Sequence, residues 1–292
     1  SSEDTTIVLA CGVYVLDGTI TLGAGRSTDS RGRLSVTAAH LPDDPGWTPA
    51  LMPVILSVAR PSVNFGFDCA VGVMVACDHV TLRGITFLGC ANPETFYYYP
   101  VGRQDMKRRD LEVSQCLFLG GHDVLTVQAA ICAHGDGVVV DHCIFHQCRN
   151  AVVFWKAEAP KRGNVMRCCI VDQAEETAIW TAHEDLDFEF RNNVVTGCAF
   201  VWCRNGVNTS RYEAVNCLFA GNTCLLAENE NSAPVQTKAL FLTGVYRIRE
   251  ARVELVRRMA ERVPRDYLHV PEGSPGAELG AGLFVKPGPR GR

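Results

Sequence analysis

The sequence lacks the features that mark nucleic-acid-binding and membrane-spanning proteins. Its 28 lysine and arginine residues are outnumbered by 32 aspartate and glutamate residues, which gives a formal net charge of -4 at pH 7. A nucleic-acid partner normally requires a basic face or stripe, so none is expected. The chain also contains no apolar run of the roughly 18 to 20 residues needed to cross a bilayer, so membrane insertion is not expected.

Two further absences concern the cysteines and the N-terminus. The 14 cysteines include no CxxC pair, which argues against zinc-ribbon and thioredoxin-like proteins. The N-terminus lacks the basic, apolar and small-residue regions of a signal peptide, yet a strand-like segment begins already at Thr5. A start of this kind fits a removed leader, so we expect a secreted, periplasmic or cell-surface protein.

A repeat of about two dozen residues runs from Val80 to Asn231. Six segments share one pattern, in which a strand-like run passes through a polar corner into an apolar pair: 82–87, 113–118, 140–145, 166–171, 190–195 and 214–219. The final residues of these segments are separated by 31, 27, 26, 24 and 24 positions. A period this regular indicates a repeat architecture, in which each unit packs on its neighbours.

A second short apolar run follows the later copies of the repeat. These runs span three to five residues and are broken by Gly, Asn, Asp and Cys, so they are too short for ordinary helices and predict strands. The LxxLxLxxN consensus of leucine-rich repeats is absent, and propeller blades need about 40 residues. The pattern therefore predicts an all-β, single-domain parallel β-helix with two or three strands in each coil.

Cysteine occupies the corner position in most copies of the repeat. Successive copies place the following residues at the same position: Ile85, Cys116, Cys143, Cys169, Asn193 and Cys217. Because stacked coils bring equivalent corners together and free cysteine is among the most buried residue types, we expect a buried ladder. A disulfide framework is the alternative. The preceding position holds Gln115, His142, Cys168, Asn192 and Asn216, which predicts a polar stack at the bend.

The repeat unit resembles the right-handed parallel β-helix repeat of the pectate-lyase-like superfamily. The opening TIVLACGVY at 6–14 and GTITL at 18–22 are similar to the "DTIVLAPGxYxLxxTIxL" of many such bacterial proteins, and VTLRGITF at 80–87 is similar to their "VTIRGITF". The resemblance covers most of the chain. It implies a right-handed β-helix over residues 1–244 and a polysaccharide as the partner, although one fold can host many functions.

The ends and interruptions of the solenoid were assigned from their composition. A solenoid exposes its apolar core at both ends and needs caps. In residues 245–263, the apolar side chains of Ile248, Leu255, Met259 and Val263 can share one helical face, which predicts a C-terminal capping helix. Residues 264–292 are expected to be irregular. The stretches 23–52 and 90–108 are expected to be loop insertions.

The superfamily resemblance implies that an active groove runs over the outer face of the sheet formed by the second apolar runs. Polar residues end these strands at matching places, and adjacent coils lie about 4.8 Å apart, so their side chains could converge. The candidates are Lys156, Glu158, His183, Glu184, Arg204, Asn205, Glu228 and Asn229. The alternative is that strands simply end in solvent.

These residue types allow two reactions. β-Elimination from a uronic acid polymer needs a base beside a cation or Ca²⁺ that neutralises the substrate carboxylate, and Lys156, His183 and Arg204 are of the right types. Glycoside hydrolysis needs two carboxylates flanking the bond. The candidates for that role are Glu158, Glu184 and Glu228. Calcium is the one cofactor that this chemistry suggests, and no motif identifies a metal site.

Aromatic residues near the same sheet have two interpretations. Trp155, Trp180 and Trp202 occupy matching places in the second runs and either stack on sugars or pack in the core. Tyr98, within the triple tyrosine at 97–99, either contacts a sugar from a loop or packs on the barrel. With Asn205 and Asn229, the residues Trp155, Trp180 and Tyr98 are the candidate substrate contacts.

Two hypotheses about function follow. The first is a carbohydrate-active enzyme, a polysaccharide lyase or glycoside hydrolase acting on an acidic polysaccharide. The second is a non-catalytic solenoid that is glycan-binding, adhesin-like or self-assembling. The aspartate-rich metal site of pectate lyases, the paired aspartates of polygalacturonases and the YxxDPHD motif of alginate epimerases are all absent, which favours the second hypothesis.

Overall fold

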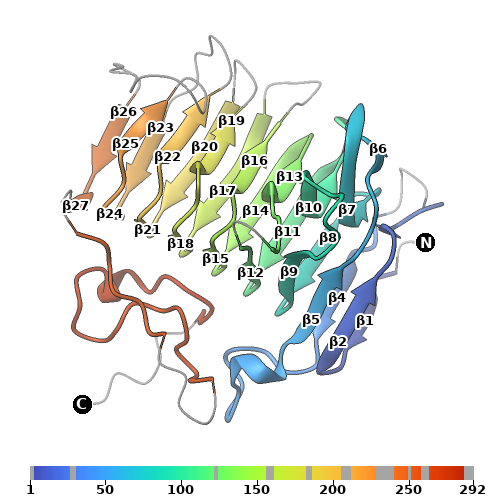
Figure 1. The fold of residues 1–292 in the computed structure, drawn as a ribbon, viewed down its shortest axis with the longest axis horizontal. Helices are drawn as coiled ribbons and strands as arrows, with labels where there is room; N and C mark the ends of the chain where they lie inside the picture. Colours follow the sequence, from blue (N-terminus) through green and yellow to red (C-terminus); the bar gives the residue numbers. More distant parts are fainter. Residues whose placement is uncertain are drawn as a thin grey trace.

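The chain folds as a right-handed parallel β-solenoid, seen here in a computed structural model (Figure 1). The structure describes residues 3–26, 31–121, 124–155, 161–181, 186–204, 212–227, 240–248, 251–257 and 263–285. Three parallel sheets, named A, B and C, run the length of the molecule, and the chain passes from A to B to C in successive coils. The predicted β-helix architecture is confirmed.

The strands of each sheet follow in spatial order. Sheet A contains β1 (Thr5–Leu9), β4 (Leu34–Ala38), β8 (Val80–Arg83), β11 (Arg109–Ser114), β14 (Asp136–Asp141), β17 (Lys161–Arg167), β20 (Leu186–Arg191), β23 (Tyr212–Val215) and β26 (Leu240–Thr243). Sheet B contains β2 (Gly12–Leu16), β5 (Pro53–Ser57), β9 (Thr86–Cys90), β12 (Leu117–Leu119), β15 (Ile144–His146), β18 (Ile170–Asp172), β21 (Val194–Thr196), β24 (Leu218–Ala220) and β27 (Tyr246–Ile248). Sheet C contains β3 (Ile20–Leu22), β7 (Phe67–Val75), β10 (Tyr98–Arg103), β13 (Ala129–Ala133), β16 (Asn150–Phe154), β19 (Thr177–Thr181), β22 (Phe200–Arg204) and β25 (Cys224–Ala227).

Few elements in the described residues lie outside these three sheets. Strand β6 (Ser62–Asn64) forms an antiparallel hairpin with β7. Two single-turn 3-10 helices occur, η1 (Pro49–Leu51) and η2 (Ala277–Leu279). Strands β4 and β10 fall inside the stretches 23–52 and 90–108 that were expected to be insertions. No helix in the described residues has the length and hydropathy needed to span a bilayer.

The interior is a column of like side chains stacked from coil to coil. Phe87, Phe118 and Phe145 occupy paired positions on β9, β12 and β15, and all three are buried. Their rings are parallel, with centroids 5.0 Å apart for Phe87 and Phe118 and 4.9 Å apart for Phe118 and Phe145. The repeat aligns one apolar residue per coil, so its period produces a continuous core.

The corner between sheets A and B has the geometry that the repeat predicted. The polar stack residues Gln115, His142, Cys168, Asn192 and Asn216 all have φ between 50° and 55°, a left-handed conformation that turns the chain sharply. Each ladder residue that follows them in sequence is buried. Of the 14 cysteines, 11 are buried and none is in a disulfide, so the interpretation of the corner cysteines as buried side chains is confirmed.

The cysteines of the ladder make the contacts that asparagine makes one coil further along. Asn193 accepts a hydrogen bond from the backbone N–H of Cys169 at 2.9 Å and donates to the carbonyl of Met166 at 2.9 Å. The Cys169 thiol likewise accepts from the N–H of Cys143 at 3.4 Å and lies 3.7 Å from the carbonyl oxygen of Val140. Cysteine therefore makes the same ladder contacts as asparagine, through longer and weaker hydrogen bonds.

This equivalence predicts that Cys169→Asn raises the free energy of unfolding by about 1 kcal/mol, because stronger N–H···O and amide–carbonyl bonds replace weak sulfur contacts. Cys169→Ala should lower it by about 1 to 2 kcal/mol, since a buried N–H loses its acceptor. Denaturant unfolding of both variants measures the two effects. Equal destabilisation by the two substitutions would contradict the interpretation.

The predicted C-terminal capping helix over residues 245–263 is wrong. Tyr246–Ile248 form strand β27, and residues 251–257 are irregular; no helix is present in the described part of this stretch. Val253 and Leu255 pack on the outside of sheet B. They are two positions apart in the sequence, which is not a helical spacing, and an arginine just after them also contacts the sheet. This arginine, Arg257, lies 2.6 Å from Asp172.

The C-terminal segment instead runs back along the solenoid (Figure 1). It covers an apolar row on the outer face of sheet B, which comprises Leu117, Ile144, Ile170, Val194 and Leu218. Leu255, Leu268 and Leu283 from the segment are buried against this row, together with Trp47 and Met52 from the loop before β5. The outer face of sheet B is therefore covered along this row.

Candidate functional site

Only some of the site residues expected from the sequence lie in the described structure. Lys156, Glu158, His183, Glu184, Asn205, Glu228 and Asn229 lie outside the described residues, so the convergence of their side chains stays a prediction. Arg204 is the last residue of β22 and is half-buried. The described part of the predicted cluster is thus this one arginine at the ends of the sheet C strands.

The tryptophans of the expected column divide between the core and the surface. Trp202 is fully buried in the interior. Trp155 and Trp180 are half-buried on the outer side of sheet C, with ring centroids 5.7 Å apart in an edge-to-face arrangement. The imidazole of His134 lies parallel to the Trp155 ring at 6.5 Å. An aromatic row therefore continues along the outer face, close to the ends of the strands.

Tyr98 does not face a ligand. Its side chain is 0% exposed and belongs to the interior cluster. Burial raises the pKa of its hydroxyl well above the usual value. Its neighbour Tyr97 is 44% exposed, because Tyr98 is the first residue of β10 and points inward. The tyrosine available to a ligand is therefore Tyr97, one position away from the residue chosen from the sequence.

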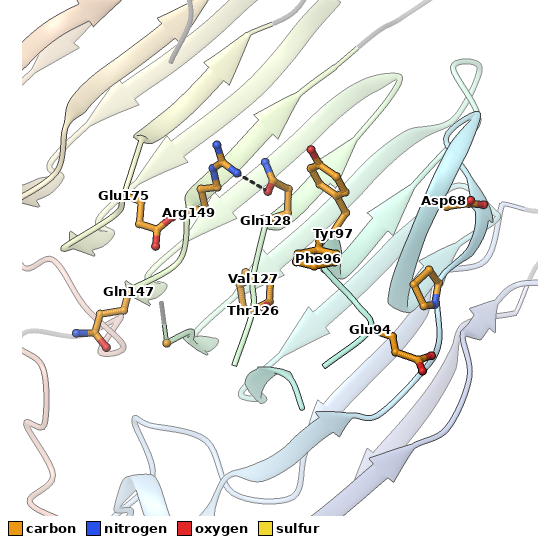
Figure 2. A pocket seen from close by; sticks show the side chains of 12 residues that line it. Asp68, Glu94, Phe96, Tyr97, Thr126, Val127, Gln128, Gln147, Arg149 and Glu175 are labelled. Carbon is orange, nitrogen blue, oxygen red and sulfur yellow. Dashed lines mark hydrogen bonds between the residues drawn. The ribbon is translucent and has the colours of Figure 1, made fainter. Parts of the chain in front are cut away.

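A pocket of about 650 Å³ opens beside Tyr97, at the starts of the sheet C strands. Its lining combines polar and aromatic side chains with short apolar ones: Pro61, Asp68, Glu94, Phe96, Tyr97, Gly121, Thr126, Val127, Gln128, Gln147, Arg149 and Glu175. Figure 2 shows Tyr97, Gln128, Arg149 and Glu175 along consecutive coils, with Asp68 and Glu94 toward the N-terminal end. The pocket is thus a shallow polar groove with an aromatic wall.

The fold places these side chains in a row because each occupies the corner that leads from sheet B into sheet C. Tyr97 precedes β10, Gln128 precedes β13 and Arg149 precedes β16. The register of sheet C stacks these corners at the strand spacing of about 4.8 Å. The same corner one coil further along carries Glu175 and Glu176 before β19.

An ion pair between half-exposed Arg149 and buried Glu176 lies in the middle of the row. The Arg149 guanidinium donates to Glu176 at 2.5 Å and to the Gln128 side chain at 3.5 Å. Asn150 donates to the other Glu176 oxygen at 2.6 Å, and both Asn150 and Glu176 are buried. Burial alone lowers the pKa of Arg149, but the Glu176 carboxylate outweighs it and raises that pKa, so the arginine stays charged. Arg149 is therefore held by Glu176 and Gln128 before any ligand arrives.

Phe96 and Tyr97 form the exposed aromatic wall of the groove. Phe96 is 78% exposed, and the Tyr97 ring lies edge-to-face with Phe67 at 5.8 Å. An exposed aromatic pair beside amide and carboxylate groups suits a ligand with both apolar faces and hydroxyls. Sequence reasoning looked for polar residues after the sheet C strands and missed this set, which comes before them. The polar residue preceding each second apolar run was the available signal.

Comparison with known proteins does not assign the chain to a family. No protein-family model matches the chain, and a search of curated proteins finds no matching relative. The functional argument therefore rests on the residues of this chain.

Proposed function

We propose that the protein binds a polysaccharide along the outer face of sheet C. The observation that carries this proposal is the groove at the strand starts, where exposed Phe96 and Tyr97 adjoin a row of hydrogen-bonding side chains. Sugar rings present an apolar face to an aromatic ring and hydroxyls to amides and carboxylates. The resemblance of the repeat to the pectate-lyase-like superfamily supports the same class of ligand.

The dimensions of the groove suit a chain molecule better than a single small ligand. Asp68 is on β7 and Glu175 precedes β19, and these strands are four steps apart in sheet C. At the spacing between strands, four steps span ~19 Å. The half-buried Trp155 and Trp180 provide further aromatic surface across the same sheet. A linear polymer lying along the solenoid contacts several coils at once.

The charge of the groove favours a neutral glycan. Three carboxylates, Asp68, Glu94 and Glu175, line the pocket with one cation, Arg149, which is already bound to Glu176. A like-charged uronic acid polymer would be repelled by this balance. The hypothesis of an acidic substrate depended on Lys156, His183 and Arg204, of which Lys156 and His183 lie outside the described residues and Arg204 does not line this pocket.

The described residues support binding more directly than catalysis. Hydrolysis requires two carboxylates about 5 to 9.5 Å apart. Asp68 and Glu175 are too distant at ~19 Å to serve one bond. Asp68 and Glu94 belong to neighbouring coils and are the pair that hydrolysis would use. An exported location accords with a polysaccharide ligand and stays a prediction.

Replacing Tyr97 by alanine should weaken glycan binding about tenfold, because the loss of one stacking ring costs ~1.4 kcal/mol. The purified protein is titrated with soluble neutral and acidic glycans by calorimetry, while reducing ends and absorbance near 235 nm are followed. Tyr246→Ala is the matched control, because Tyr246 is 65% exposed on β27, outside the groove.

Three outcomes are decisive. Binding of a neutral glycan that Tyr97→Ala weakens and Tyr246→Ala does not would support the proposal. Release of reducing ends would add hydrolysis to it and direct attention to Asp68 and Glu94. An absence of binding across the panel, or an equal loss in both variants, would refute the groove as a glycan site.

A further inference from the structure

The polar stack at the corner between sheets A and B changes in character at two adjacent coils. Gln115, Asn192 and Asn216 give this stack side-chain amides, which suit a hydrogen-bonded ladder. Between them stand His142 and Cys168, whose imidazole and thiol are ligands of transition metals. None of these residues lines the sheet C groove, so the proposed glycan site is not involved.

The backbone brings His142 and Cys168 to the same place on successive coils. The register of β14 and β17 pairs Asp141 with Arg167, the residues that precede them. His142 donates its backbone N–H to the carbonyl of Arg167 at 3.1 Å, and both corner residues have φ of 52°. The two side chains therefore start from equivalent positions of the turn, one strand spacing apart.

Asp141 adds a carboxylate to this pair. One of its oxygens, a ring nitrogen of His142 and the Cys168 sulfur all lie within 4.8 Å of one another. A tetrahedral zinc ion, bound about 2.0 Å from nitrogen and oxygen and about 2.3 Å from sulfur, needs ligand atoms about 3.3 to 3.6 Å apart. Small side-chain rotations are enough to reach that spacing. Among the residues that the structure describes, no other three histidine, cysteine or acidic side chains form such a group.

Neighbouring side chains hold the carboxylate and the thiol in place. Arg167 donates to one oxygen of Asp141 at 2.8 Å, and the other oxygen lies 2.6 Å from Nδ1 of His142. The Asn192 amide donates to the Cys168 sulfur at 3.9 Å. Hydrogen bonds of this kind, made behind metal ligands, orient those ligands and raise the affinity for the ion.

The thiol distinguishes this cluster from another histidine–carboxylate pair of the solenoid. His146 and Asp172 lie 2.6 Å apart, and Arg257 binds the same carboxylate. Imidazole, carboxylate and guanidinium are thus present there too, but within the described structure no cysteine completes a group of three ligands with them. A contact of this type by itself holds neighbouring segments together, and Cys168 is the addition that makes the corner a ligand set.

We propose that Asp141, His142 and Cys168 bind a zinc-like divalent ion through three protein ligands and one water. A thiolate, an imidazole and a carboxylate together suit zinc, whereas calcium and magnesium take oxygen ligands. The ion takes the place of the proton between His142 and Asp141, and the Cys168 thiol loses its proton, because metal ligands bind in their deprotonated forms.

The exposure of the cluster agrees with an open coordination position. The side chains of His142 and Asp141 are 11% and 17% exposed, and Cys168 is half-buried. Structural zinc sites are closed by four protein ligands, whereas sites with three protein ligands keep a position for water. The adjacent Cys169 does not supply a fourth ligand, since it is buried and its thiol lies 3.1 Å from the carbonyl oxygen of Arg167.

The test is titration of the whole reduced protein with Co²⁺, a spectroscopic substitute for zinc. A cobalt–thiolate bond gives a charge-transfer band in the near ultraviolet, and four-coordinate cobalt gives intense visible bands. We expect both to saturate at one equivalent of cobalt and to disappear when zinc is added. Cys168→Ser should remove the charge-transfer band. His142→Gln and Asp141→Asn should each weaken cobalt binding at least about tenfold.

Two matched variants control for adventitious binding. His146→Gln removes the imidazole of the comparable pair, and Cys11→Ser removes the exposed thiol, so neither should change the cobalt spectrum. X-ray absorption at the zinc edge of the wild-type protein should show one sulfur and three nitrogen or oxygen ligands, a result that does not depend on the folding of any variant. The absence of a band at one equivalent, a spectrum that Cys168→Ser leaves intact, or a sulfur count other than one would overturn the proposal.

Discussion

Replacing Phe118 by alanine is expected to lower the free energy of unfolding by about 5 kcal/mol. Truncation of a buried phenylalanine to alanine lowers the free energy of unfolding by about 3 to 5 kcal/mol, and the loss of each stacked aromatic partner adds about 0.5 to 1.5 kcal/mol. Phe118 is 0% exposed and stacks in parallel on Phe87 and Phe145, so both contributions apply. Chemical denaturation followed by circular dichroism measures the change.

The control for this prediction is Phe96→Ala. Phe96 is 78% exposed, so its removal should change the free energy of unfolding by less than about 0.5 kcal/mol. A loss below about 2 kcal/mol in Phe118→Ala would mean that neighbouring coils collapse into the space, against the rigid stacking of the interior.

The second large effect is an acid destabilisation that originates at His269. This histidine is buried, and its Nε2 accepts a hydrogen bond from the N–H of Leu283 at 2.9 Å. Burial lowers its pKa from 6.5 to about 4, against the opposing influence of Asp266 and two backbone hydrogen bonds. Between these values the unfolded chain binds more protons than the folded one, so stability falls as the pH is lowered.

The expected size of this effect is about 3 kcal/mol between pH 7 and pH 4, from a shift of this magnitude. Carboxylates also titrate near the lower limit, so the measurement is a difference between wild type and His269→Gln. Denaturant unfolding at several pH values should show the wild type losing about 3 kcal/mol more than the variant. Parallel pH profiles would show that His269 does not titrate in this way.

The fold was predictable because each coil of the solenoid repeats the same pattern of strands and corners. Six aligned segments defined the period, and the ladder position could be read directly from Cys116 to Cys217. The failure came at Val253 and Leu255, where spacing alone did not distinguish a helical face from an extended strip lying on another sheet. Only the apolar row of sheet B, a tertiary feature, decides between them.

The candidate site was less predictable, since it depends on which side of a strand a residue emerges. Tyr97 and Tyr98 differ by one position and point in opposite directions, so one is 44% exposed and the other is buried. Arg149 became a candidate only when its contact with Glu176 was known, 27 residues further along. Predicting which side chains of neighbouring coils touch requires the register between their strands. The sequence does not fix that register where the coils differ in length.

The returning C-terminal segment changes how the molecule can come apart. A bare solenoid has contacts only between successive coils, so its ends can fray one coil at a time. Here Val285 donates to Asp43 at 3.1 Å and Arg265 donates to the carbonyl of Pro42 at 3.0 Å, across 242 and 223 residues of sequence. Trp47 and Phe284 pack edge-to-face at the same junction. The C-terminal segment therefore links the last coils to the first ones, and we expect the end coils to unfold only after these contacts break.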